Sequence, residues 1–149
     1  MRRITLTGYS ALVLLVTLWP SPPDPTSSGL IRTVLDRLHD VGLPDALDIV
    51  FVEAAANVAM FVPLGALLPA AAVLPRVNRA RPWLAVPVLA AFSGLIETTQ
   101  LLLPERVPTL QDVVMNTTGG ALGVAALLLL DRRRAARTAA AARTAAPAA

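Results

Sequence analysis

The sequence predicts an all-α polytopic membrane protein with four transmembrane helices and an amphipathic helix in the first outer loop. The first observation is composition: 55% of the residues are hydrophobic and only 15% are charged. The second is that the apolar residues gather in four runs, and a helix needs roughly 20 residues to cross a bilayer. The runs cover residues 4–19, 47–74, 83–103 and 110–130. In a chain of 149 residues, four spans leave function to the helices and their short connections.

The first run, residues 4–19, is short and follows two arginines, as a secretory signal peptide would. The proline-rich sequence after it, TLWPSPPDP, offers no small-x-small cleavage site, which favours an uncleaved first span. In the connection that follows, apolar residues recur at helical spacing and charged residues occupy the other face, which predicts an amphipathic helix lying on the outer membrane surface or packed over the bundle. The apolar positions are Leu30, Ile31, Val34, Leu35 and Leu38.

The other end of the chain has a simpler composition. Residues 132–149 are almost entirely Ala and Arg. Low-complexity segments of this kind are often disordered, so we expect a disordered cytoplasmic tail or a frayed extension of the last helix. The predicted transmembrane domain is therefore residues 1–131.

The arginines predict the orientation. All 13 basic residues are Arg, and three of them, Arg32, Arg37 and Arg106, fall on one side of the predicted membrane. By the positive-inside rule, the side with the other ten is cytoplasmic, and both termini lie there. Those ten are Arg2, Arg3, Arg76, Arg79, Arg81, Arg132, Arg133, Arg134, Arg137 and Arg143. Because they are divided among juxtamembrane positions, they predict contact with anionic lipid and not with nucleic acid.

Polar residues inside the apolar runs mark the candidate site, because a carboxylate at membrane depth is costly and rarely without a role. At 1.5 Å of rise per residue, six of them lie roughly 3–15 Å below the outer surface. Residues three or four apart share a helix face, so each helix presents a polar stripe that we expect to face inward. The six are Glu53, Asn57, Glu97, Gln100, Asp112 and Asn116.

Two further features complete the predicted ligand-binding site. Arg106, in the short outer connection, could pair with a carboxylate or bind a ligand carboxylate or phosphate. Gly119 and Gly123 have the G-x-x-x-G spacing that lets helix backbones approach each other. Purely structural roles stay open: Thr109 and Asp112 form a T-x-x-D capping arrangement, and the asparagines could join helices by hydrogen bonds.

These residues resemble the VanZ-like family of membrane proteins. The resemblance rests on two blocks: N-V-A-M-F-V-P-L-G from Asn57, and the stretch from E-T-T-Q at Glu97 through Arg106, Asp112 and Asn116 to the glycines. It implies a multi-pass protein of the bacterial cytoplasmic membrane and the cell envelope, from a family whose founding member is associated with lowered susceptibility to teicoplanin-type antibiotics. Thr109 departs from the Asp or Ser expected there, although all three are good helix N-caps.

Three functional classes remain. The favoured one is a non-catalytic module whose outward polar pocket binds a lipid-linked envelope precursor or a peptidoglycan-related ligand. The second is an intramembrane hydrolase or transferase using Glu97, Asp112 and Arg106, which the absence of a well-placed His, Cys or Ser nucleophile weakens. The third is a small transporter, although the inner half lacks polar residues. No metal or cofactor is predicted: the three carboxylates could hold Mg²⁺ or Ca²⁺ together with waters, but their spacing is specific to neither ion. The oligomeric state stays open.

Overall fold

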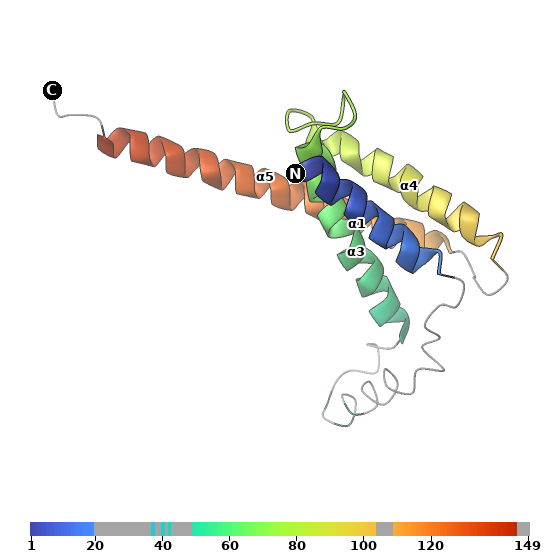
Figure 1. The fold of residues 1–149 in the computed structure, drawn as a ribbon. Coiled ribbons are helices and arrows are strands. Elements are labelled where there is room, and N and C mark those ends of the chain that lie inside the picture. The colour runs from blue at the N-terminus through green and yellow to red at the C-terminus, as the bar shows by residue number, and fades with distance from the viewer. Residues whose placement is uncertain (20–36, 38–39, 41, 43–48, 104–108, 146–149) are drawn as a thin grey trace.

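The computed structural model describes residues 1–19, 37, 40, 42, 49–103 and 109–145, and these residues form an all-helical bundle (Figure 1). This confirms the predicted all-α class. In chain order the elements are α1 (Arg2–Thr17), α3 (Ile49–Ala71), the 3₁₀ turn η1 (Pro82–Leu84), α4 (Ala85–Gln100) and α5 (Leu110–Ala145).

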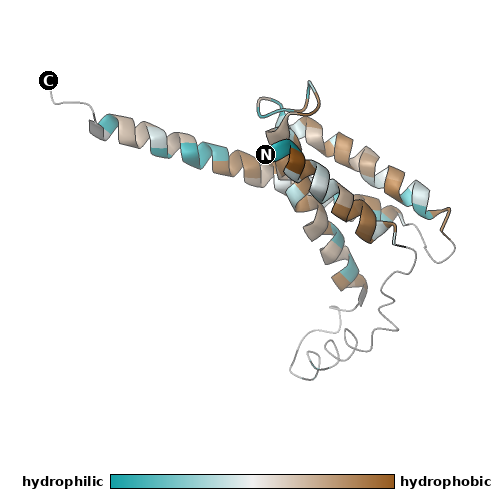
Figure 2. Cartoon of the chain, in the orientation of Figure 1, coloured by the Kyte–Doolittle hydropathy of each residue, from teal (hydrophilic) through white to brown (hydrophobic). Residues whose placement is uncertain are grey.

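By length and composition, three of the helical segments are able to cross a membrane: Val50–Ala71, Pro82–Gln100 and Leu110–Arg143. Helix α1 has 16 residues, fewer than the roughly 20 that span a bilayer. A fourth span therefore stays a prediction, and the predicted amphipathic helix at residues 30–38 falls almost entirely outside the described residues. Apolar residues dominate the bundle, whereas polar residues concentrate in the 72–81 connection and the second half of α5 (Figure 2).

Helices α3 and α5 make the most extensive contact among the described helices, and glycines permit their close approach. A Cβ atom added at Gly119 would overlap the backbone carbonyl of Val58, and one at Gly123 would overlap that of Val62. On the opposite side of the contact, a Cβ at Gly65 would overlap the carbonyl of Gly120. The predicted G-x-x-x-G pair therefore lies in a helix crossing where the backbones touch directly.

The other two helices pack around this crossing through side chains. Phe61 of α3 is fully buried, and its ring lies 6.2 Å from the ring of Phe92 on α4. Leu89 of α4 covers Gly120 of α5. Helix α1 packs mainly on α3, where the Tyr9 hydroxyl donates a 3.0 Å hydrogen bond to the Met60 carbonyl. The core thus lies between α3, α4 and α5, with α1 on its side.

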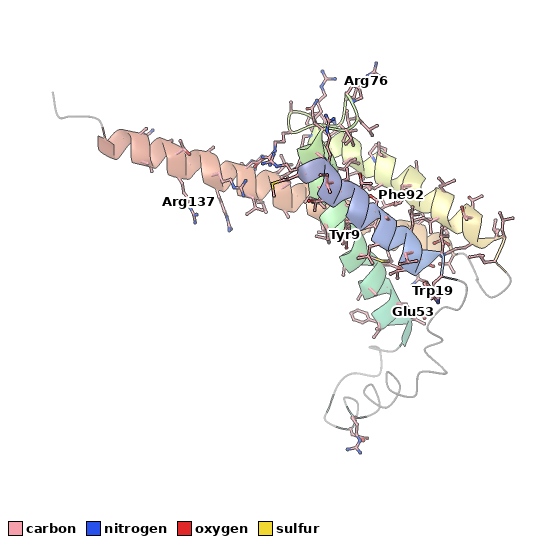
Figure 3. The ribbon with its side chains drawn as sticks, viewed as in Figure 1. Tyr9, Trp19, Glu53, Arg76, Phe92 and Arg137 are labelled. Atoms are coloured by element: carbon pink, nitrogen blue, oxygen red, sulfur yellow. The ribbon has the colours of Figure 1, made fainter. Side chains whose placement is uncertain are left out.

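Helix α5 continues well past the predicted end of its span at residue 130. It has 36 residues, or roughly 54 Å, against a hydrocarbon core of roughly 30 Å. The segment from Arg132 to Ala145 projects from the bundle as a helix, with Arg137 exposed on it (Figure 3). For this segment we expected either a disordered tail or an extension of the last helix, and through Ala145 the structure has the helical extension. Ala and Arg are both strong helix formers, so low complexity did not mean low helix propensity.

Candidate functional site

Seven polar residues gather at the end of the bundle opposite the N-terminus, and we call them the polar cluster. Each helix brings them there at a defined place: the first half of α3, the end of α4 and the start of α5. Five of the seven were predicted as ligand-binding residues, and the structure brings those five together. The members are Asn57, Ser93, Glu97, Gln100, Thr109, Asp112 and Asn116.

Glu97 connects the end of α4 to the start of α5. Its side chain is buried, with 9% of its surface exposed, and its Oε2 accepts a 3.0 Å hydrogen bond from the backbone N–H of Thr109. The Thr109 Oγ1 in turn accepts a 3.1 Å hydrogen bond from the backbone N–H of Asp112. Thr109 is thus the N-cap of α5, as the T-x-x-D pattern predicted. In a usual capping box the residue at position 112 would also reach the N-cap N–H, but here Glu97 does so.

Because Glu97 takes that role, the Asp112 carboxylate is available to a different helix. Asn57 Nδ2 on α3 donates to Asp112 Oδ1 at 2.6 Å, and both side chains are partly buried. A carboxylate in the first turn of a helix is also favoured by the helix dipole. Asp112 therefore caps α5 electrostatically and ties it to α3.

Asn116 lies one turn deeper along α5 and carries the least satisfied polar atom of the cluster. Its Nδ2 donates to Ser93 Oγ at 2.9 Å, and only 2% of the residue is exposed. Its Oδ1 is buried and has no hydrogen-bond partner among the described residues. Leaving a buried acceptor unpaired costs about 1–3 kcal/mol, so this oxygen is a place where a donor would bind favourably.

Gln100 extends the cluster to α1. Its Nε2 donates to the backbone carbonyl of Thr17 at 2.8 Å, and both residues are buried. That carbonyl is in the last turn of α1, where it has no partner within its own helix. Each of the four described α-helices therefore reaches the polar cluster.

Two predicted site residues are not part of this arrangement. Glu53 is exposed near the N-terminal end of α3 (Figure 3) and makes no hydrogen bond or ion pair with the described residues. It lies one turn before Asn57, where α3 has already diverged from α5 beyond their crossing, so sharing a face with Asn57 does not bring it to the cluster. Arg106 lies outside the described residues.

Three contacts of the cluster were not predicted as part of the site. Ser93 lies one turn before Glu97 on the same helix, and this spacing could have identified it. The backbone N–H of Thr109 and the carbonyl of Thr17 could not be found by comparing side chains. Among the described residues, no group of three or more His, Cys, Asp and Glu side chains is arranged to hold a metal ion.

The opposite end of the bundle is basic. The 72–81 connection and the N-terminus lie side by side there, with Arg76 projecting from the connection (Figure 3). Arg3 Nε donates to the Ala71 carbonyl at 3.4 Å, and Arg79 pairs with Asp131 of α5. The exposed Trp83 in η1 adds an aromatic side chain of the kind enriched at membrane interfaces. The two ends therefore differ in chemistry: amides and carboxylates predominate at one, and arginines at the other.

Long apolar helices joined by glycine packing and buried polar contacts define an integral membrane protein of the multi-helix type. The model of the VanZ/LLP1 family matches residues 6–131, and the chain belongs to this VanZ-like family. The predicted family resemblance is thereby confirmed. No curated protein and no solved structure matches the chain significantly.

Proposed function

We propose that this VanZ-like protein acts in the bacterial cytoplasmic membrane as a non-catalytic binding module, with its polar cluster facing outward. Its ligand is the polar headgroup of a lipid-linked envelope precursor or a related peptidoglycan component. Retention of that ligand alters susceptibility to teicoplanin-type glycopeptides. The observation that carries the proposal is the buried Asn116 Oδ1, which has no hydrogen-bond partner among the described residues and lies one turn deeper along α5 than the partly exposed Asp112.

The chemistry of the cluster suits sugars and peptide amides. Asn116 Oδ1 would accept a hydrogen bond from a ligand hydroxyl or N–H group, and the second oxygen of Asp112 offers another acceptor near the rim. Arg106 would supply the positive charge for a ligand phosphate or carboxylate. A few convergent polar groups on an apolar scaffold are the usual composition of a small-molecule site.

The outward orientation is supported by the distribution of charge. The connection at residues 72–81, the N-terminus and the projecting part of α5 all leave the bundle at the basic end, opposite the polar cluster (Figure 1). Arginines accumulate on the cytoplasmic side of bacterial membrane proteins. With the basic end in the cytoplasm, both termini are cytoplasmic and the polar cluster faces the envelope.

Binding is favoured over hydrolysis because both carboxylates already have structural partners. Glu97 accepts from the Thr109 backbone and Asp112 accepts from Asn57, so each holds a helix in place. A general base would need to be in hydrogen-bond reach of the proton it removes from a reactant. The intramembrane enzyme remains the alternative, and it requires a product that a binding module does not form.

The direct test is mass spectrometry of the lipids and precursors that co-purify with the protein from bacterial membranes. Wild type should retain a specific envelope precursor. In Asn116→Leu the affinity for this precursor should be about tenfold lower, because one buried hydrogen bond contributes about 1.4 kcal/mol. Thr118→Ala is the matched control, since Thr118 is exposed on α5 and its hydroxyl contacts only Val114 of its own helix. Equal precursor content in all three proteins would contradict the proposal.

A second measurement separates binding from catalysis. Glu97→Gln keeps an oxygen that can accept from Thr109 but removes the charge. Under the binding proposal, incubation of purified wild type with its co-purified precursor leaves the precursor intact, and Glu97→Gln changes only the amount retained. Conversion of the precursor by wild type and not by Glu97→Gln would establish the enzyme instead.

A further inference from the structure

A second candidate site lies at the basic end of the bundle, away from the polar cluster. It is an apolar groove of about 150 Å³ between α1, α3 and α4. Six of its seven lining residues are apolar, and the seventh is a serine. The lining residues are Leu6, Ser10, Leu64, Leu68, Val88, Leu89 and Phe92. The lining offers an apolar ligand a surface with one polar side chain, Ser10.

We propose that this groove binds an acyl chain of an anionic phospholipid whose phosphate is held by Arg3 and Arg81. The groove exists because α1 packs on α3 and leaves a gap toward α4, whose Phe92 instead packs on Phe61. In a bilayer, such a gap is filled by a hydrocarbon chain. Its apolar lining matches that chain and would not bind a sugar or a peptide terminus.

Charge complementarity identifies the headgroup. Arg3 lies on the same face of α1 as Leu6 and Ser10, because residues three and seven positions apart share a helix face. Its Nε donates to the carbonyl of Ala71, which places the guanidinium at the end of the groove between α1 and α3. Only Nε is used in this contact, so the two terminal nitrogens can donate to a phosphate as a fork.

Arg81 lies at the same end of the groove, on the side formed by α4. It is exposed and directly precedes η1, the turn that leads into α4 with its lining residues Val88, Leu89 and Phe92. Among the described residues, the only ion pair is Arg79 with Asp131, so Arg3 and Arg81 have no acidic partner there. A phosphate would supply one, and the exposed Trp83 would lie at the headgroup level beside it.

The test is native mass spectrometry of the full chain in detergent, titrated with phosphatidylglycerol or phosphatidylcholine of equal chain length. Wild type should bind one phosphatidylglycerol more tightly than phosphatidylcholine. In the double variant Arg3→Gln, Arg81→Gln, that affinity should fall by up to about 25-fold, or about fivefold for each arginine near an anionic surface. The matched control is Arg137→Gln, Arg143→Gln, which removes the same charge from the projecting part of α5.

A groove-filling variant tests the acyl chain separately. Ser10→Phe places a ring in the groove and should lower the affinity for both lipids; Val88→Phe serves the same purpose if Ser10→Phe does not fold. Inorganic phosphate at millimolar concentration should not displace the lipid, because it lacks the chain. Equal affinity for both lipids, equal effects of the two arginine pairs, or unchanged binding in a folded groove-filling variant would each overturn the proposal. Because Asn116 lies in the polar cluster at the opposite end of the bundle, Asn116→Leu should leave phosphatidylglycerol binding unchanged.

Discussion

Where α3 crosses α5 the two helices touch backbone to backbone, whereas at the polar cluster they are joined through side chains. The crossing uses Gly119 and Gly123 against the carbonyls of Val58 and Val62. The cluster uses hydrogen bonds such as Asn57 to Asp112. In lipid there is no hydrophobic force to bring helices together, so close packing and polar contacts must do it.

The difference between these two regions indicates where a ligand can bind. At the crossing the two backbones lie so close that a Cβ atom added at Gly65, Gly119 or Gly123 would overlap the facing helix. The cluster keeps one buried acceptor, Asn116 Oδ1, that has no partner in the part of the chain that the structure describes, and a purely structural contact would not need it. The crossing therefore makes the helix pair rigid. It fixes the positions of the polar residues of α3 and α5, as a binding site requires.

The largest expected effect is at the crossing. Gly119→Ala and Gly123→Ala each introduce a Cβ that overlaps a backbone carbonyl, and overpacking of this kind costs about 1–3 kcal/mol. Because backbone cannot rotate away, we expect the upper part of that range, or a fall of about 5–10 °C in the melting temperature in detergent. Gly94→Ala is the control, since nothing lies within 4 Å of its added Cβ and alanine favours the helix. Equal melting of all three variants would contradict a backbone contact.

A smaller effect is expected within the cluster. Ser93→Ala removes the acceptor of Asn116 Nδ2 and leaves a buried donor unpaired, at a cost of about 1–3 kcal/mol. Thr98→Ala on the same helix is the control, because Thr98 is exposed and contacts only the Gly94 carbonyl. Removing both partners, in Ser93→Ala with Asn116→Leu, should recover part of the lost melting temperature. Additive losses in the double variant would show that the two side chains do not depend on each other.

Much of the fold could be predicted from the sequence because the membrane imposes a simple rule. A span needs a long apolar run. Helices α3 and α4 lie within the runs predicted for them, and α5 begins at the first residue of its predicted run. The end of the bundle at which the polar residues gather could be predicted too. Rise per residue is constant, and this placed Glu97, Asp112 and Asn116 at one end. The G-x-x-x-G spacing predicted a close helix contact for the same reason of regular geometry.

What could not be predicted depends on how helices lie relative to one another. Glu97 replaces Asp112 in the capping box only because the end of α4 lies beside the start of α5. The divergence of α3 from α5, which excludes Glu53, is likewise a property of the crossing angle and not of any local pattern. The groove beside α1 arises from a gap between three helices, and no single helix encodes it.

The smallest expected effect concerns the cap of α5, and it shows how far side chains rather than backbone hold the polar end. Thr109→Ala removes the hydroxyl that accepts from the Asp112 N–H, which typically costs about 1 kcal/mol, or about 2–4 °C in melting temperature. Thr109→Ser keeps an equivalent oxygen and should melt close to wild type. The Glu97 contact survives in both variants because its donor is the Thr109 backbone. If Thr109→Ser lost as much stability as Thr109→Ala, the hydroxyl would not be the cap, and the polar end would depend mainly on Glu97.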